Sequence, residues 1–165
     1  MAIPMTRAEL NENHDEIIRQ VRQIYMACLQ TTLTPVGGLN FVILYGSRAR
    51  GDYSWNSDVD LVICSPAFDG VRVLDRFDII AECSLAGISA EIEPVCYSAA
   101  EALSALDAGR VTILEALQDG IDLFDDGSIL PELHAKFDAL KASGRIARRK
   151  ILGNLVWDIR GLLNL

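Results

Sequence analysis

The sequence is short of positive charge and has no long apolar run, and each of these features disfavours a class of protein. Fifteen Lys and Arg residues face 23 Asp and Glu, which gives a net charge of −8. A chain this acidic lacks the broad basic surface that holds long nucleic acid. No apolar stretch reaches the ~18–20 residues that cross a bilayer, and the N-terminus has no basic region followed by an apolar run. We therefore expect a soluble, cytoplasmic protein with no membrane partner.

Two familiar cofactor patterns are missing as well. No G-x-G-x-x-G motif follows an expected strand, which argues against a Rossmann-type dinucleotide site. No C-x-x-C spacing occurs, although four cysteines lie in separate apolar segments: Cys28, Cys64, Cys83 and Cys96. Free cysteine is commonly a small core residue, so we expect four buried thiols rather than a disulfide or a zinc site. His14 and His134 are expected to be solvated residues without a catalytic role.

The apolar patterns predict one α/β (α+β) domain over residues 1–165. The chain has 165 residues, half of them hydrophobic, which is enough for one core and too few for two. Helical or strand periodicity runs through an N-terminal helix at 6–31, a core at about 39–124 and C-terminal helices at 130–165. Within the core the expected strands lie at 39–45, 59–64, 88–97 and 121–124, and the expected helices at 71–86, 98–108 and 111–118.

The most informative stretch joins the first two strands. Gly46 and Ser47 follow the first apolar run, and Gly46 permits a sharp turn close to a ligand. Asp58 and Asp60 alternate with apolar residues at the start of the second strand, so both carboxylates share one face. Side-by-side carboxylates repel unless a cation lies between them, and oxygen ligands that leave room for phosphates suit Mg²⁺. Tyr53 and Trp55, in the intervening loop, either stack on a base or pack the loop onto the domain.

A second acidic pair lies on the strand expected at 88–97. Glu91 and Glu93 alternate with Ile92 and Pro94, so both glutamates share a face. Carboxylates within a strand are costly if they are buried without a partner. We therefore expect one of the two to lie opposite the aspartates and to share cations with them. Pro94 also indicates an edge strand or one that ends early.

The order Gly-Ser-Arg-Ala-Arg-Gly over 46–51, followed by Ser-Asp-Val-Asp-Leu over 57–61, resembles the signature of the DNA polymerase beta-like nucleotidyltransferases, most closely the minimal nucleotidyltransferase branch. The resemblance implies a small mixed sheet flanked by helices. It also implies a third acidic residue, for which Glu93 is the better match and Glu91 the alternative, although the family more often has Asp there. The implied nucleotide-binding residues are Gly46, Ser47, Arg48, Arg50 and Ser57.

The resemblance implies transfer of a nucleoside monophosphate from a nucleoside triphosphate to an acceptor hydroxyl, with release of pyrophosphate. Asp58, Asp60 and Glu93 would hold two Mg²⁺ ions about 3.5–4 Å apart. The acceptor, whether small molecule, protein or RNA end, is not encoded in any motif. The alternative is an antitoxin-like or regulatory module that acts through a helical partner protein. An apolar, partly basic segment over 145–165, expected to be a C-terminal helix, would dock on that partner or on a second copy.

Overall fold

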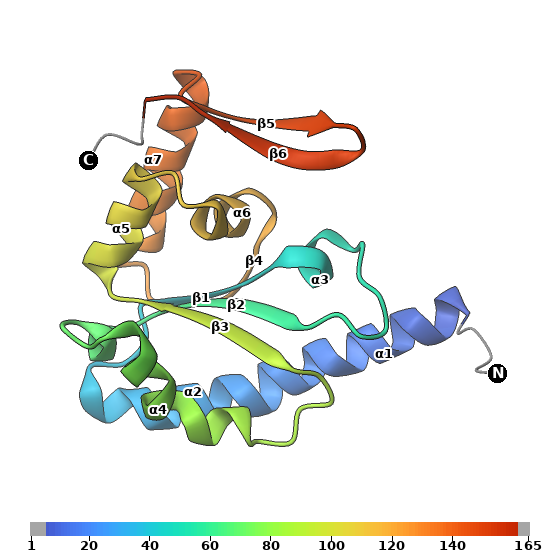
Figure 1. Ribbon diagram of the computed structural model, residues 1–165. Helices are drawn as coiled ribbons and strands as arrows, with labels where there is room; N and C mark the ends of the chain where they lie inside the picture. Colours follow the sequence, from blue (N-terminus) through green and yellow to red (C-terminus); the bar gives the residue numbers. More distant parts are fainter. Residues whose placement is uncertain (1–5, 162–165) are drawn as a thin grey trace.

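The computed structural model describes residues 6–161 as a mixed four-stranded sheet with helices on both faces and a C-terminal hairpin (Figure 1). The strand order is β3-β2-β1-β4. Strand β1 is antiparallel to both β2 and β4, whereas β2 and β3 are parallel. The bounds of these strands are Phe41–Tyr45 for β1, Val59–Cys64 for β2, Ile92–Tyr97 for β3 and Ile121–Asp125 for β4.

One group of helices covers the lower face of the sheet in Figure 1. It consists of a continuous N-terminal helical segment and a crossover helix. The segment comprises α1 (Arg7–Gln20), a single π-helical stretch (Val21–Tyr25) and α2 (Met26–Leu33), and the crossover helix is α4 (Val73–Ser84). The opposite face carries α5 (Ala99–Asp107), α6 (Val111–Asp119) and α7 (Leu130–Ala142). The expected fold class, a small mixed sheet flanked by helices, is confirmed.

Strand alternation divides the core into two layers and leaves one end of the upper face polar. On β1, Val42 and Leu44 pack towards α1, α2 and α4, while Phe41 and Ile43 pack towards α5, α6 and α7. On β2, Val62 and Cys64 also belong to the layer under α5–α7. The next residue of this series on β2 is Asp60, at the end of the sheet where the α3 turn (Gly46–Arg50) begins. The polar end of the strands is therefore the open end of the upper layer.

Local sequence features define the ends of several elements. Thr6 and Ser98 each form a complete capping box, with Glu9 and Glu101 respectively. Pro94 lies on β3, which is an edge strand of the sheet as expected. The strand expected at 88–97 begins only at Ile92. Among residues 6–161, none of the helices combines the length and apolar character that a bilayer crossing requires.

The expectation of a C-terminal helix over 145–165 is wrong. After α7 the chain forms an antiparallel hairpin of β5 (Ile146–Ile151) and β6 (Asn154–Ile159), while residues 162–165, like residues 1–5, lie outside the described part. A two-residue turn at Leu152 and Gly153, both with positive φ, joins the strands. Apolar residues along this segment recur at intervals compatible with either a strand or a helix, so their density alone did not exclude the strand.

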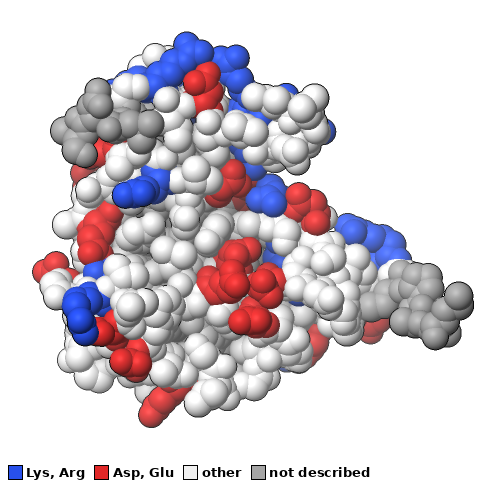
Figure 2. Space-filling model, viewed as in Figure 1, with Lys and Arg blue, Asp and Glu red and all other residues white. Residues whose placement is uncertain are grey.

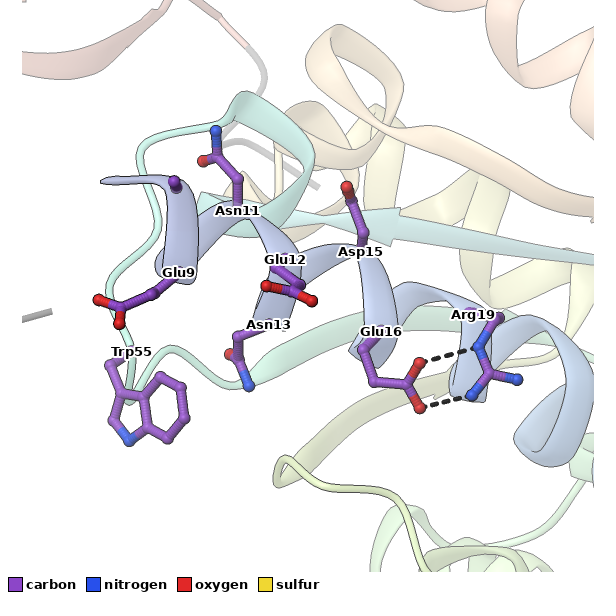
Figure 3. Close-up of a pocket in the computed structure, with 9 residues that line it drawn as sticks. Glu9, Asn11, Glu12, Asn13, Asp15, Glu16, Arg19 and Trp55 are labelled. Atoms are coloured by element: carbon purple, nitrogen blue, oxygen red, sulfur yellow. Dashed lines mark hydrogen bonds and ion pairs between the residues drawn. The ribbon is translucent and has the colours of Figure 1, made fainter. Parts of the chain in front are cut away.

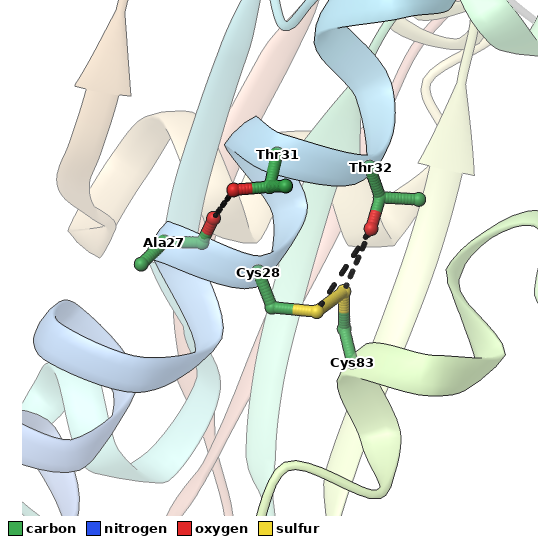
Figure 4. Close-up of a disulfide and its surroundings, with 5 residues drawn as sticks. All are labelled: Ala27, Cys28, Thr31, Thr32 and Cys83. Carbon is green, nitrogen blue, oxygen red and sulfur yellow. Dashed lines mark hydrogen bonds between the residues drawn. A yellow bond between two sulfur atoms is a disulfide. The ribbon is translucent and has the colours of Figure 1, made fainter.

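The expectation of four free thiols is also wrong. Cys28 on α2 and Cys83 on α4 form a disulfide that links the two helices on the lower face, with Thr32 beside both sulfur atoms (Figure 4). Their Cα atoms are 5.5 Å apart, although 55 residues separate them along the chain. Cys64 and Cys96 are the buried free thiols, and burial raises the pKa of each to about 12.

The disulfide gives the first testable prediction. Replacing both Cys28 and Cys83 with Ser should lower the free energy of unfolding by about 2–4 kcal/mol, because the bond restricts the unfolded chain over a long loop. Urea unfolding with and without dithiothreitol measures the effect. The reductant should destabilise the natural chain and leave the double Ser variant unchanged. Equal midpoints for the natural chain in both conditions would contradict the assignment.

Candidate active site

Three strands place a tyrosine and two carboxylates side by side at the open end of the sheet. Asp60 on β2 is in register with Tyr45 on antiparallel β1 and with Glu93 on parallel β3. Residues in register on neighbouring strands project to the same face, so the three side chains form one row. Figure 2 shows acidic atoms gathered on this part of the surface, below the hairpin. The pairing expected between the aspartates and the third strand therefore exists for Asp60 and Glu93.

Gly46 brings the Gly-Ser turn directly against this row. Its φ is +73°, a conformation that L side chains rarely adopt, and a Cβ atom there would overlap the Asp60 carboxylate. Gly46 is therefore needed both for the turn and for the close approach of Asp60. The short helix α3 starts here, and Ser47 is its second residue. The sequence-predicted Gly46, Ser47 and Asp60 thus lie together.

The surroundings of Asp60 disfavour its charge. Burial, followed by the negative charges of Glu93 and Asp58, raises the pKa of Asp60, and Arg50 and Arg48 act in the opposite direction. Burial, followed by the charge of Asp60, also raises the pKa of Tyr45 to about 12, so Tyr45 stays neutral at physiological pH. The row is therefore an acidic site whose carboxylates repel one another.

Asp58 and Glu91 form a second acidic pair beside the row. Both line a cavity of about 280 Å³ with Asn13 and Trp55, and the Glu91 carbonyl accepts a hydrogen bond of 2.8 Å from the Val59 amide. Glu93 lines a different cavity, which contains Tyr45. Within residues 6–161, no three His, Cys, Asp or Glu side chains stand close enough to form a ready-made metal centre. The acids are thus gathered as two adjacent pairs.

Arg48 supports the loop from inside. Its side chain is among the most buried in the protein, at 2% exposed. Its Nε donates to the carbonyl oxygens of Ser57 (2.9 Å) and Asp58 (3.2 Å). A nucleotide-binding role was implied for Arg48, but its donors are turned to the backbone that carries Asp58. These hydrogen bonds hold the loop in place, and nucleotide binding by Arg48 stays a prediction.

The aromatic loop packs onto α1. Tyr53 is buried, its ring stacks on His14 with centroids 4.0 Å apart, and its hydroxyl donates to Asn11. His14 also lies 3.4 Å from Arg48, and burial, followed by the charge of that arginine, lowers its pKa. The expectation of a solvated His14 is therefore wrong. Trp55, by contrast, is 54% exposed and projects beside the acidic face of α1 (Figure 3).

The remaining motif residues divide between the loop and a basic cavity. Ser57 Oγ accepts a hydrogen bond from the Ser54 amide and so closes the loop. Arg50 pairs with Asp52 and with Glu115 on α6, and all three line a cavity of about 570 Å³ beside Tyr45 and Gly46. The other wall of this cavity is the hairpin. Sequence reasoning missed Glu115 and the hairpin residues, although the basic cluster at 145–150 was the available signal.

Comparison with known proteins supports the reading of the motif segment. A family model described as a nucleotidyltransferase domain matches residues 34–92, which run from just before β1 through the Gly-Ser turn and both aspartates to the first residue of β3. Over this segment the resemblance expected from the motif is confirmed. The match includes Glu91 and ends one residue before Glu93. No curated protein matches the chain in sequence.

One solved structure supports the fold, and two others are reported beside it. A protein of Sulfolobus solfataricus, provisionally described as a nucleotidyltransferase, shares 17% identity at a TM-score of 0.50, covering 77% of this chain and 96% of its own. A toxin–antitoxin structure with AMP-PNP shares 16% identity at a TM-score of 0.48 (81% and 90% covered). A structure of a tri-AMPylated HEPN toxin of Shewanella oneidensis in complex with MNT antitoxin shares 14% identity at a TM-score of 0.45. The match covers 82% of this chain and 88% of the other. At 17% identity, the likeness to the Sulfolobus solfataricus protein concerns the fold alone.

The role of Arg48 is testable through stability. Arg48→Met keeps an apolar stem but leaves the carbonyls of Ser57 and Asp58 without their buried donor, so it should cost about 2–4 kcal/mol. Chemical unfolding measures the loss. The control is Arg72→Met, whose exposed pairing with Asp75 is worth at most ~1 kcal/mol. Equal, small losses for the two variants would show that Arg48 does not hold the loop.

The repulsion at Asp60 makes a prediction of opposite sign. The pKa of Asp60 is higher in the folded protein than in the unfolded chain. The folded state is therefore destabilised as the pH rises from the pKa of the unfolded chain to that of the folded protein, because the unfolded chain loses this proton more readily. In EDTA at pH 7, Asp60→Asn should therefore raise the melting temperature by roughly 1–2 °C, a small effect because solvent screens the site. The gain should vanish near pH 3, where the natural carboxyl is protonated. A lower melting temperature at pH 7 would mean that Asp60 stabilises the fold.

Proposed function

We propose that this chain transfers a nucleoside monophosphate from a nucleoside triphosphate to an acceptor hydroxyl. In that reaction the acceptor oxygen forms a bond to the α-phosphorus, the bond to the bridging oxygen breaks, and pyrophosphate leaves. The observation that carries the proposal is the row of Asp60 and Glu93 against the Gly46 turn, within and at the border of the matched nucleotidyltransferase segment. Nucleotidyl transfer is the general activity of that family.

The side chains around the turn suggest individual roles. Gly46 and Ser47 approach the phosphates, and Arg50, at the edge of the basic cavity, adds a charge-assisted bond. Glu93, exposed on the edge strand, is the base for the acceptor proton. Arg48 and Ser57 hold the loop so that Asp58 stays beside Asp60.

The donor set fits Mg²⁺. Carboxylate oxygens are the ligands that this hard cation takes alongside substrate phosphates, and the mutual repulsion of Asp58, Asp60 and Glu93 is the condition that a cation relieves. When bound, the ion would offset the negative charge of the phosphates and of the leaving pyrophosphate. Glu93 is preferred to Glu91 as third ligand because it is in register with Asp60 and contributes to its raised pKa.

A second candidate function is a regulatory or antitoxin-like module that docks on a helical partner protein. The tip of the hairpin favours it, because Ile151, Leu155 and Val156 are exposed and Leu152 is 97% exposed. Leu152 also has a φ of 49°, which costs energy for a bulky residue. This apolar tip takes the place of the expected terminal helix as a docking surface for a partner or a second copy.

Transfer is tested by incubating the protein with each labelled nucleoside triphosphate, Mg²⁺ and cell extract, and then identifying the labelled acceptor. Asp60→Asn and Glu93→Gln should each reduce labelling by about 100-fold or more, since each removes a carboxylate that would hold Mg²⁺ beside the reacting phosphates. Glu91→Gln is the matched control, with the same chemical change two residues away on the same chain segment, and should label at close to the natural rate. A reversed order of the two glutamate variants would reassign the third ligand.

A double variant separates the two functions. If the folded Asp58→Asn, Asp60→Asn double variant affects the partner protein in cells as the natural chain does, docking alone produces that effect and nucleotidyl transfer is not needed. If the double variant folds, still docks on the partner, and loses the effect, transfer chemistry is required. No label from any of the four nucleoside triphosphates, in an extract that contains the partner, would reject transfer.

A further inference from the structure

The cavity between the α3 turn and the hairpin shares Tyr45 with the acidic row, but neither Asp60 nor Glu93 lines it. Its volume of about 570 Å³ is within the range of small-molecule sites. One wall is the motif, through Tyr45, Gly46 and Arg50, so the cavity opens next to the row that contains Asp60. The other wall is the hairpin, which overhangs α3 and α6 (Figure 1). The hairpin lies outside the segment that matches the family model.

The hairpin wall is basic. Arg148 and Lys150, two residues apart on β5, project to the same face, and both line the cavity. Lys150 is exposed, and no ion pair engages it within residues 6–161. Arg148 Nε is buried and has no hydrogen-bond partner in the described chain. A buried donor left without an acceptor is uncommon and points to a group that the protein binds.

Glu115 fixes the distance between the two walls. Its Oε2 accepts from Arg50 of the motif (3.2 Å) and from Arg148 of the hairpin (3.1 Å). Its Oε1 accepts from the Trp157 indole on β6 at 2.8 Å. Arg148 is also paired with Asp119 on α6. The hairpin is therefore tied to the catalytic turn by a shared carboxylate, and its basic face is held towards that turn.

We infer that the hairpin is the second wall of the nucleotide site, and that Lys150 binds the triphosphate of the incoming nucleotide. This inference rests on the proposed transfer function. The acidic row repels an anion, so a triphosphate needs cationic contacts on the side of the row that faces the hairpin. Lys150 supplies an uncompensated positive charge there, and Arg148 supplies an unpaired donor behind it. Through Arg148 and Arg50, Glu115 ties the strand that carries Lys150 to the α3 turn.

Lys150→Gln tests the inference by a binding measurement that needs no acceptor. Calorimetric titration in Mg²⁺ with each of the four nucleoside triphosphates, and with inorganic tripolyphosphate, should show about tenfold weaker binding than in the natural chain. The matched control is Arg149→Gln, which removes the same charge from the adjacent residue. Arg149 projects to the opposite face of β5 and pairs with Asp158, so its loss should change affinity less than about twofold.

The outcomes distinguish this inference from the proposed function. Unchanged affinity of Lys150→Gln, or an equal loss in both variants, overturns the role of Lys150 and leaves nucleotidyl transfer standing. A loss for the nucleotides without a loss for tripolyphosphate also overturns it, because the contact would then be to the base or sugar. Absence of nucleotide binding by the natural chain rejects both ideas. Lys150→Arg, which keeps the charge, should retain most of the affinity.

Discussion

The candidate site depends on one unfavourable arrangement. Asp60 and Glu93 are in register on neighbouring parallel strands, so their two carboxylates lie side by side. Two carboxylates in this position repel, and burial of Asp60 adds to the cost, which is visible in the raised pKa of Asp60. The apolar residues of the same strands offset this cost, because Val62 and Cys64 pack fully under α5–α7. Gly46 then allows the turn to approach Asp60 where any side chain would collide. The fold thus holds charge together at the one end of the upper face that the helices leave open.

The two arginines of the motif perform different tasks, although they lie on the same short helix. Arg48 turns inward and holds the carbonyls of the loop, whereas Arg50 turns towards α6 and meets Glu115. Glu115 in turn receives Arg148 and Trp157 from the hairpin. One carboxylate therefore connects the motif, the helix layer and the C-terminal strands. A site of this kind is rigid because its supports come from packed elements rather than from loops alone.

Most of the fold was predictable because its signals are local. Capping boxes at Thr6 and Ser98, the apolar runs of β1 and β2, and Pro94 on an edge strand each depend on neighbouring residues. The C-terminal segment was misjudged because its apolar spacing suits a helix as well as a strand. The turn at Leu152 and Gly153 decided in favour of the hairpin, and the Gly-Asn pair at 153–154, between apolar residues, was its local sign.

The sequence by itself determined which residues are candidates for the chemistry, since the Gly-Ser turn and the alternating aspartates need only their own strands to share a face. Tertiary structure decided every pairing across the chain. It set Glu93 rather than Glu91 in register with Asp60, joined Cys28 to Cys83, stacked His14 on Tyr53 and brought Arg148 to Glu115. The reason is physical: alternation and capping are fixed by bonded neighbours, whereas register and long-range contacts follow from how the helices pack on the sheet.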